Sequence, residues 1–141
     1  MNSRKSLGLQ IGATMKIMVK QLQEAFSNKD PKISIDQFMI LDILNTKENI
    51  TQKVISEILS KDKSLILRQV DDLKKKNLVV RFPDTQDLRK KNLMLTKRGI
   101  DVLHSLLEEE AKVFEVLLKD LTNDQIDLLS KTFSSIQANA K

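Results

Sequence analysis

The sequence contains no cysteine, no tryptophan and no tyrosine, and its one histidine is His104. Without cysteine the chain can form no disulfide and offers no thiolate nucleophile or thiol redox sensor. One histidine also gives no cluster with the spacing of a zinc site. We therefore expect a protein that is not an enzyme and that holds no metal or cofactor. A small hydrolase is the enzymatic alternative, and turnover of ester or phosphate substrates that is lost on changing His104 would support it.

Long apolar runs are absent as well. No segment approaches the roughly 20 apolar residues that a membrane-spanning helix needs, and the N-terminal MNSRKSLGLQ lacks the apolar stretch of a signal peptide. We expect the protein to stay in the cytoplasm, with no membrane partner. The 141 residues include three glycines and two prolines, which favours long helices with few irregular loops. Such a chain fits one domain, or one domain with helices that are completed by a second copy.

Charge is abundant but unevenly distributed. Lys and Arg number 24 against 19 Asp and Glu, which gives a formal charge of +5. Between Lys61 and Arg98 there are 12 basic residues against 5 acidic ones, a local net charge of +7, so the flanks are slightly acidic. A basic middle of this kind indicates a polyanionic partner.

Apolar spacing and capping residues predict helices at the start of the chain. Apolar residues recur at intervals of three and four from Leu7 to Phe26, which predicts one long helix. Ser34 then opens a capping box of the form S-x-x-Q, so a second helix should begin near Ile35 and run to about Thr46.

Two further helices are predicted before the middle of the chain. Thr51 should cap a short helix, and Ser60 or Asp62 should cap a fourth helix that ends near Asn77. The inward-facing residues of these two helices should be Val54, Ile55, Ile58, Leu59, Ile66, Val70 and Leu73.

After Asn77 the apolar period changes from about 3.6 to 2, which is the period of a strand. The segment 78–82, a turn at Pro83-Asp84 and the run 93–95 predict an antiparallel hairpin, a two-stranded ribbon. Thr96 and Thr122 should each cap one of two final helices. The order of these elements predicts a mainly α protein with a winged helix-turn-helix.

The turn of this hairpin lies in RFPDTQDLRKK, residues 81–91, which carries two arginines, two lysines and two aspartates. Neither a core nor a turn requires so many cations. In a winged helix-turn-helix, one helix enters the major groove of DNA while the basic loop meets neighbouring phosphates and the narrow minor groove, whose negative potential attracts arginine. Double-stranded DNA is therefore the predicted partner.

Four motifs, in this order, resemble the MarR (multiple antibiotic resistance regulator) family of bacterial repressors. They are D-K-S at 62–64, D-x-L-x-K-K from Asp71, R-x-P-D-x-x-D-x-R at 81–89 and L-T-x-x-G at 95–99. The order and lengths of the outer helices match as well, so the resemblance covers nearly the full chain. The chain departs from the family at Leu65 and Leu67, where polar residues are usual, and at Asn77, where glycine is usual.

The resemblance implies a homodimeric transcriptional regulator, a repressor on a pseudopalindromic operator, from which a small-molecule effector of unknown identity could release it. The recognition helices of such a dimer would lie about 34 to 36 Å apart. The implied organisation is a dimerisation helix and loop at 1–33, a winged helix-turn-helix DNA-binding domain at 34–98 and dimerisation helices at 99–141. The apolar faces of the outer helices favour a second copy independently.

Twelve residues are candidates for the DNA interface. We expect Arg89 to enter the minor groove and Asp87 to orient Arg89 or Arg81 by a charge-assisted hydrogen bond. The others are lysines suited to phosphates, a major-groove face on the fourth helix and the amide end of the short helix. The full set is Thr51, Gln52, Lys61, Lys63, Ser64, Leu65, Arg68, Arg81, Asp87, Arg89, Lys90 and Lys91.

A protein-docking module is the alternative function. Its leucine-bearing fourth helix would dock on protein instead of DNA, and it predicts weak, sequence-blind DNA binding together with a defined protein complex. The runs Lys74–Lys76 and Glu108–Glu110 are most simply solvated helix surfaces.

Overall fold

Capping side chains fix the starts of most helices in the computed structural model, which describes residues 3–140. Ser34 and Gln37 form the predicted capping box, and the hydroxyls of Thr51, Thr96 and Thr122 each accept a hydrogen bond from the amide three residues on. The elements are α1 (Ser3–Ser27), α2 (Ile35–Thr46), β1 (Ile50–Thr51), α3 (Gln52–Leu59), α4 (Lys63–Lys75), β2 (Val79–Pro83), β3 (Lys91–Leu95), α5 (Lys97–Leu117) and α6 (Asn123–Asn139).

The segment between α3 and α4 contains the two residues predicted to cap α4, Ser60 and Asp62, and the structure shows which of them occupies the cap position. Ser60 ends α3 in the left-handed conformation, with φ of 52°, and so does not cap α4. Asp62 occupies the cap position, but its carboxylate makes no capping bond to an α4 amide. It accepts instead a 2.5 Å hydrogen bond from the Ser64 hydroxyl. Asn77 ends α4 with φ of 62°, in the left-handed region where asparagine is tolerated.

The sheet has three strands rather than the predicted two. Its order is β1-β3-β2 with antiparallel pairing throughout, and Ile50 pairs with Leu93 while Arg81 pairs with Leu93 from the other side. The third strand was missed because two residues between helices give no alternation that a period-2 pattern could detect. It ties the start of α3 directly to the wing.

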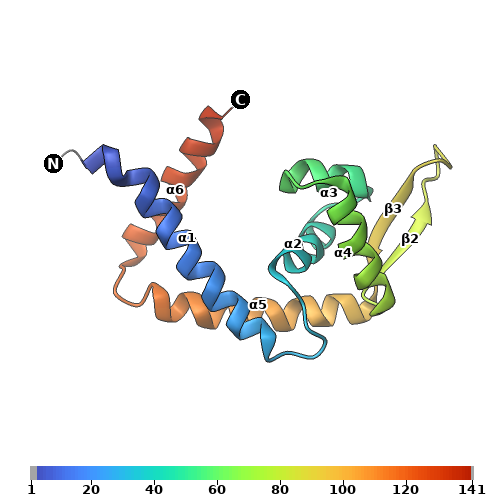
Figure 1. The fold of residues 1–141 in the computed structure, drawn as a ribbon, viewed down its shortest axis with the longest axis horizontal. Coiled ribbons are helices and arrows are strands. Elements are labelled where there is room, and N and C mark those ends of the chain that lie inside the picture. The colour runs from blue at the N-terminus through green and yellow to red at the C-terminus, as the bar shows by residue number, and fades with distance from the viewer. Residues whose placement is uncertain (1–2, 141) are drawn as a thin grey trace.

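The core lies within the winged part of the chain, where α2, α3, α4 and the sheet pack with the first half of α5 and with the C-terminal end of α1 (Figure 1). All the predicted inward residues of α4 are buried, whereas Ile58 of α3 is 42% exposed and does not belong to the core. Gly99 sets the angle of α5, because a Cβ there would lie 2.1 Å from the Leu78 carbonyl oxygen. The fully buried side chains are Phe26, Ile40, Leu41, Ile55, Ile66, Val70, Leu73, Leu78, Val79, Leu103 and Leu106.

The outer helices extend away from this core. Figure 1 shows α1 and α6 on the side opposite the hairpin, with α5 running from the base of the hairpin to that side. No residue of α6 is buried, and residues 7–17 of α1 are exposed. Their exposed apolar residues are Leu7, Leu9, Ile11, Met15, Ile17, Leu128, Leu129, Phe133 and Ile136. Within residues 3–140, no helix is both long and apolar enough to cross a membrane.

Candidate nucleic-acid interface

The wing loop is built around the carboxylate of Asp84. Its Oδ2 accepts hydrogen bonds from the amides of Gln86 and Asp87 at 3.1 and 2.9 Å, and its Oδ1 accepts one from the buried Asn92 side chain at 2.9 Å. The Asn92 hydrogen bond, followed by those of the two amides, holds the pKa of Asp84 below its ordinary value. An ionised aspartate therefore organises the turn that the Pro-Asp pair predicted.

Arg89 leaves this loop for solvent. Asp87 Oδ1 accepts hydrogen bonds from both the Arg89 amide at 3.0 Å and its side-chain Nε at 3.3 Å, so the orienting contact predicted between these residues is present. The Arg89 side chain is 92% exposed, and Leu88 between them is 74% exposed. The wing thus presents a partly oriented guanidinium beside an apolar side chain, and the charge pattern gave no signal for Leu88.

The outward side of α4 carries the other predicted contacts. Lys63, Ser64 and Arg68 are exposed, and Leu65 is half-buried. Lys61 is exposed in the short segment that precedes the helix. These residues lie on the side of α4 away from its buried row, where a groove of DNA could approach them.

Arg81 has different surroundings from Arg89. Its Nη2 donates to Asp71 Oδ1 of α4 at 2.7 Å, and its Nε donates to Gln52 Oε1 of α3 at 2.9 Å. The side chain is 21% exposed. One guanidinium therefore joins β2, α3 and α4. Asp71 was not among the predicted site residues, because its contact with Arg81 forms only when the wing folds back against α4.

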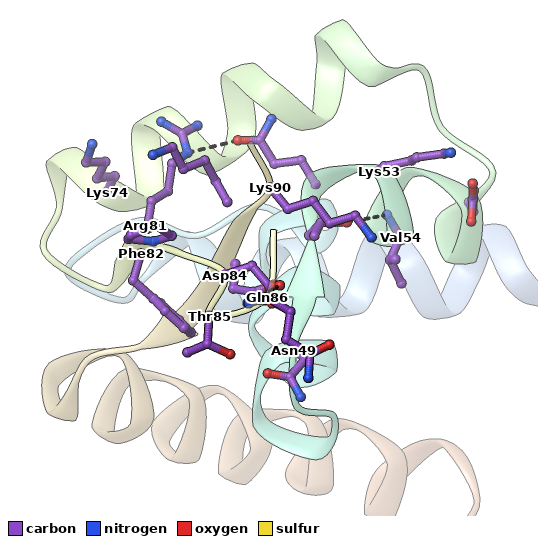
Figure 2. Close-up of a pocket in the computed structure, with 16 residues that line it drawn as sticks. Asn49, Lys53, Val54, Lys74, Arg81, Phe82, Asp84, Thr85, Gln86 and Lys90 are labelled. Carbon is purple, nitrogen blue, oxygen red and sulfur yellow. Dashed lines mark hydrogen bonds between the residues drawn. The ribbon is translucent and has the colours of Figure 1, made fainter. Parts of the chain in front are cut away.

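An open hollow of about 1200 Å³ lies between the wing and α3. In the view of Figure 2, Lys74 and Arg81 lie on one side of it and Lys53 on the other, with Lys90 between them. Five basic side chains against two acidic ones give this hollow a positive surface suited to phosphate. Its charged residues are Lys53, Lys74, Arg81, Lys90, Lys91, Glu57 and Asp84.

The structure brings several predicted residues together at this hollow. Thr51, Gln52, Arg81, Lys90 and Lys91 all line it, although the Thr51 hydroxyl is used as the cap of α3 and the Gln52 side chain holds Arg81. Its lining residues do not include the tip residues Asp87 and Arg89, nor the four predicted contacts on α4, which are Lys63, Ser64, Leu65 and Arg68. Lys53 was missed by the sequence interpretation, although its place in the first turn of α3 beside Thr51 was a usable signal.

A second polar network supports the far end of α4. Asp72 Oδ2 accepts from Gln37 Nε2 at 2.7 Å and from Lys76 Nζ at 2.8 Å, while Lys76 also donates to the Lys32 carbonyl at 2.8 Å. The hydrogen bonds from Lys76 and then from Gln37 lower the pKa of Asp72. The lysine run is therefore more than a solvated helix end, because Lys76 links α4 to the loop between α1 and α2.

The glutamates of α5 also differ from the expected solvated surface. Glu109 forms a 3.3 Å ion pair with Lys29, and the hydrogen bond from Lys29 lowers its pKa. Burial, and then the charge of Asp42, raise the pKa of Glu110. Among residues 3–140 there is no group of three or more acidic or histidine side chains placed to hold a metal ion.

The helical core, the outward face of α4 and the basic wing define a winged helix-turn-helix protein of the DNA-binding class. Residues 33–91 match the model of the MarR family. Over this segment, which is less than half of the chain, the sequence is similar to the MarR family of transcriptional regulators.

Solved structures extend the likeness to nearly the whole chain. A cysteine-to-serine mutant of MarR from E. coli, complexed with operator DNA, has a TM-score of 0.81 at 26% identity and covers 96% of each chain. BldR from Sulfolobus solfataricus has a TM-score of 0.86 at 22% identity, over 98% of this chain and 96% of its own. CouR from Rhodococcus jostii RHA1, bound to p-coumaroyl-CoA, has a TM-score of 0.84 at 17% identity, and the match covers 100% of this chain and 98% of CouR. No curated protein matches the chain significantly.

Proposed function

We propose that the protein is a homodimeric repressor that binds a pseudopalindromic operator through α4 and the wing. The observation that carries this proposal is the pair of exposed cationic elements, Arg68 on α4 and Arg89 on the wing, on one winged domain. A mutant of E. coli MarR, a protein with a similar fold and 26% identity, is complexed with operator DNA, which supports operator binding by this chain.

Each predicted contact other than Arg81 has a proposed role in binding DNA. Arg89 enters the minor groove, Arg68 reaches the major groove with Ser64 and Leu65 beside it, and Asp87 orients Arg89 without meeting DNA. The phosphate contacts are Thr51, Gln52, Lys61, Lys63, Lys90 and Lys91.

The outer helices are proposed as the dimer interface, in keeping with a winged domain at 34–98 between dimerisation segments at 1–33 and 99–141. Their exposed apolar rows have no cover within one subunit. Release by a small molecule is a further part of the proposal. CouR is bound to p-coumaroyl-CoA, but its identity to this chain is too low to indicate which ligand this chain takes.

The test is fluorescence anisotropy on the DNA upstream of the protein's own gene and on a scrambled duplex, across a salt series. We expect a preference of about 10³-fold or more for one site. The slope of log affinity against log salt concentration, the salt slope, should correspond to roughly 6 to 10 phosphate contacts per dimer. Arg89→Ala should weaken specific binding by about tenfold or more, since a base-edge or groove arginine contributes about 1–3 kcal/mol.

Lys119→Ala is the matched control, because it removes one exposed cation from the segment between α5 and α6. Figure 1 shows this segment on the side opposite the hairpin. The substitution should leave affinity and salt slope unchanged. Equal, weak binding to both duplexes that is insensitive to Arg89→Ala would contradict the proposal and favour the protein-docking alternative.

A further inference from the structure

The outward face of α4 has few free hydrogen-bonding groups. With about 100° between successive residues, the buried row Ile66, Val70 and Leu73 places Ser64, Arg68 and Asp71 on the opposite side. Ser64 donates to Asp62, and Asp71 accepts from Arg81. Within residues 3–140, Arg68 is the one of these three side chains that holds no hydrogen bond or ion pair. Of these three side chains, Arg68 is therefore the one with free hydrogen-bond donors, whereas the Ser64 and Asp71 oxygens can only accept.

Leu67 lies beside Arg68 and is 43% exposed. A single exposed leucine is ordinary on a protein surface. This one, however, stands on the second turn of the helix proposed to enter the major groove. The same helical geometry places it on the flank that also carries Lys63 and Lys74, and Lys74 lines the hollow between the wing and α3. Leu65 lies on the other flank and is half-buried.

The charge around Leu67 decides which partner it suits. Lys63 precedes it by one turn, Arg68 is adjacent and Lys74 follows by two turns, while the nearby Asp71 carboxylate is neutralised by its ion pair with Arg81. An apolar side chain in a cationic surface fits an apolar group carried by a polyanion. In the major groove that group is the C5-methyl of thymine, which alanine, threonine and other apolar groups contact in DNA complexes.

We propose that Leu67 is a specificity-determining residue that recognises a thymine methyl group in each operator half-site, next to a base read by Arg68. This inference rests on the proposed function, because it assumes that α4 occupies the major groove. It also gives a reason for the leucine at a position where the family usually carries a polar residue: the chain would recognise a methyl group instead of a hydrogen-bonding edge.

The test uses deoxyuridine, which differs from thymidine only by the missing C5-methyl. Wild-type protein first selects duplexes from a random pool, and each thymine of the selected half-site is then replaced by uracil, one position at a time in both half-sites. We expect one position at which uracil weakens binding about fourfold per half-site, the effect of losing one buried methyl group, and little change elsewhere. Leu67→Ala should reduce the effect of uracil at that position, because its shorter side chain makes less contact with the methyl group.

Met94→Ala is the control variant, because Met94 is an exposed apolar residue on β3, outside α4. It should keep the thymine preference. If Leu67→Ala fails to fold, as circular dichroism would reveal, Leu67→Val serves in its place and should reduce the thymine preference.

Three outcomes would count against the inference, in distinguishable ways. Tight, specific binding with no position sensitive to uracil overturns the role of Leu67 and leaves the proposed function intact. A uracil effect of the same size in Leu67→Ala assigns the methyl contact to another side chain. Failure to select any duplex overturns the proposed function, and with it the inference.

Discussion

Arg81 and Arg89 flank the same wing turn, yet their guanidinium groups have different surroundings. Arg81 is mostly buried between Asp71 and Gln52, whereas Arg89 projects into solvent from the wing tip. A charge-assisted hydrogen bond to an oriented carboxylate holds a side chain well only when both partners are kept in place. We therefore propose that Arg81 is a positioning residue, which fixes the wing relative to α4, and that any contact of its own with DNA is secondary.

The dependence of DNA affinity on salt concentration distinguishes a positioning residue from a phosphate contact. Arg81→Ala should weaken specific DNA binding by roughly tenfold without changing the salt slope, because the loss is one of geometry. Lys91→Ala, which removes an exposed strand lysine, should instead reduce the slope by about 1. In a double-mutant cycle, Asp71→Ala should add little to Arg81→Ala. A decrease in slope for Arg81→Ala, with additive effects of the two substitutions, would identify Arg81 as a phosphate contact.

At the scale of elements, α4 is held at both ends by polar contacts that cross the fold. Arg81 connects its outer face to α3 and β2, while Asp72 and Lys76 connect its end to α2 and the preceding loop. A recognition helix must keep its orientation to keep its register in a groove. These polar contacts fix the orientation of α4 relative to its neighbours, which the apolar contacts on its buried side would not fix alone.

Asp72 makes part of this support depend on pH. Its folded-state pKa is lowered, so its contribution is present at neutral pH and is lost as the pH falls through that lowered value. The Asp72 side chain is 47% exposed, so solvent screening limits the expected loss in Asp72→Asn to about 1 kcal/mol at pH 7. Urea unfolding at one fixed protein concentration should show this difference at neutral pH and its disappearance in acid.

Asp101→Asn provides the comparison, since Asp101 is an exposed carboxylate on α5. It should change the free energy of unfolding little at any pH. A difference between Asp72→Asn and wild type that stays constant into acid would show that the effect of the substitution is steric.

Local signals predicted the elements well, and contacts across the fold were harder to predict. The caps at Ser34, Thr51 and Thr122 depend on residues three positions apart, so a sequence shows them directly. The contact of Arg81 with Asp71 spans ten residues, and that with Gln52 spans 29. Nothing in local spacing indicates that these side chains meet. The candidate site was therefore predicted as a set of cations, without the acidic and amide groups that hold one of them.

At the scale of the whole molecule, the winged part buries most of its apolar residues, whereas α6 and residues 7–17 of α1 leave most of theirs exposed. Phe133 and Ile136 on α6, and Leu7 and Met15 on α1, all expose about half of their surface. Apolar rows of this extent are unusual on a monomer. They match the proposal that two copies of the chain pair through these helices.

Disrupting this surface should separate the subunits. The double substitution Phe133→Asp and Ile136→Asp would bury charge at the proposed interface, and we expect the dimer dissociation constant to rise on the order of 100-fold or more. Sedimentation equilibrium would measure it, with Met94→Asp as an exposed apolar control on the hairpin that should remain dimeric. Operator affinity should fall with the dimer, because the two half-sites would no longer be bound as one unit. A double variant that stays dimeric at low micromolar concentration would contradict the proposed interface.

The length of α5 has a mechanical consequence. Its 21 residues form one unbroken helix that is about 30 Å long at 1.5 Å per residue. Gly99 presses its first turn against the Leu78 carbonyl at the base of the wing, and its far end reaches the outer helices. If the helix rotates as a rigid rod about its far end, a rotation of about 5° moves its wing end by roughly 3 Å over that length. In the proposed dimer, any event that changes how the outer helices meet would alter the spacing of the two wings, and so their fit to neighbouring turns of DNA, without touching a residue proposed to contact DNA.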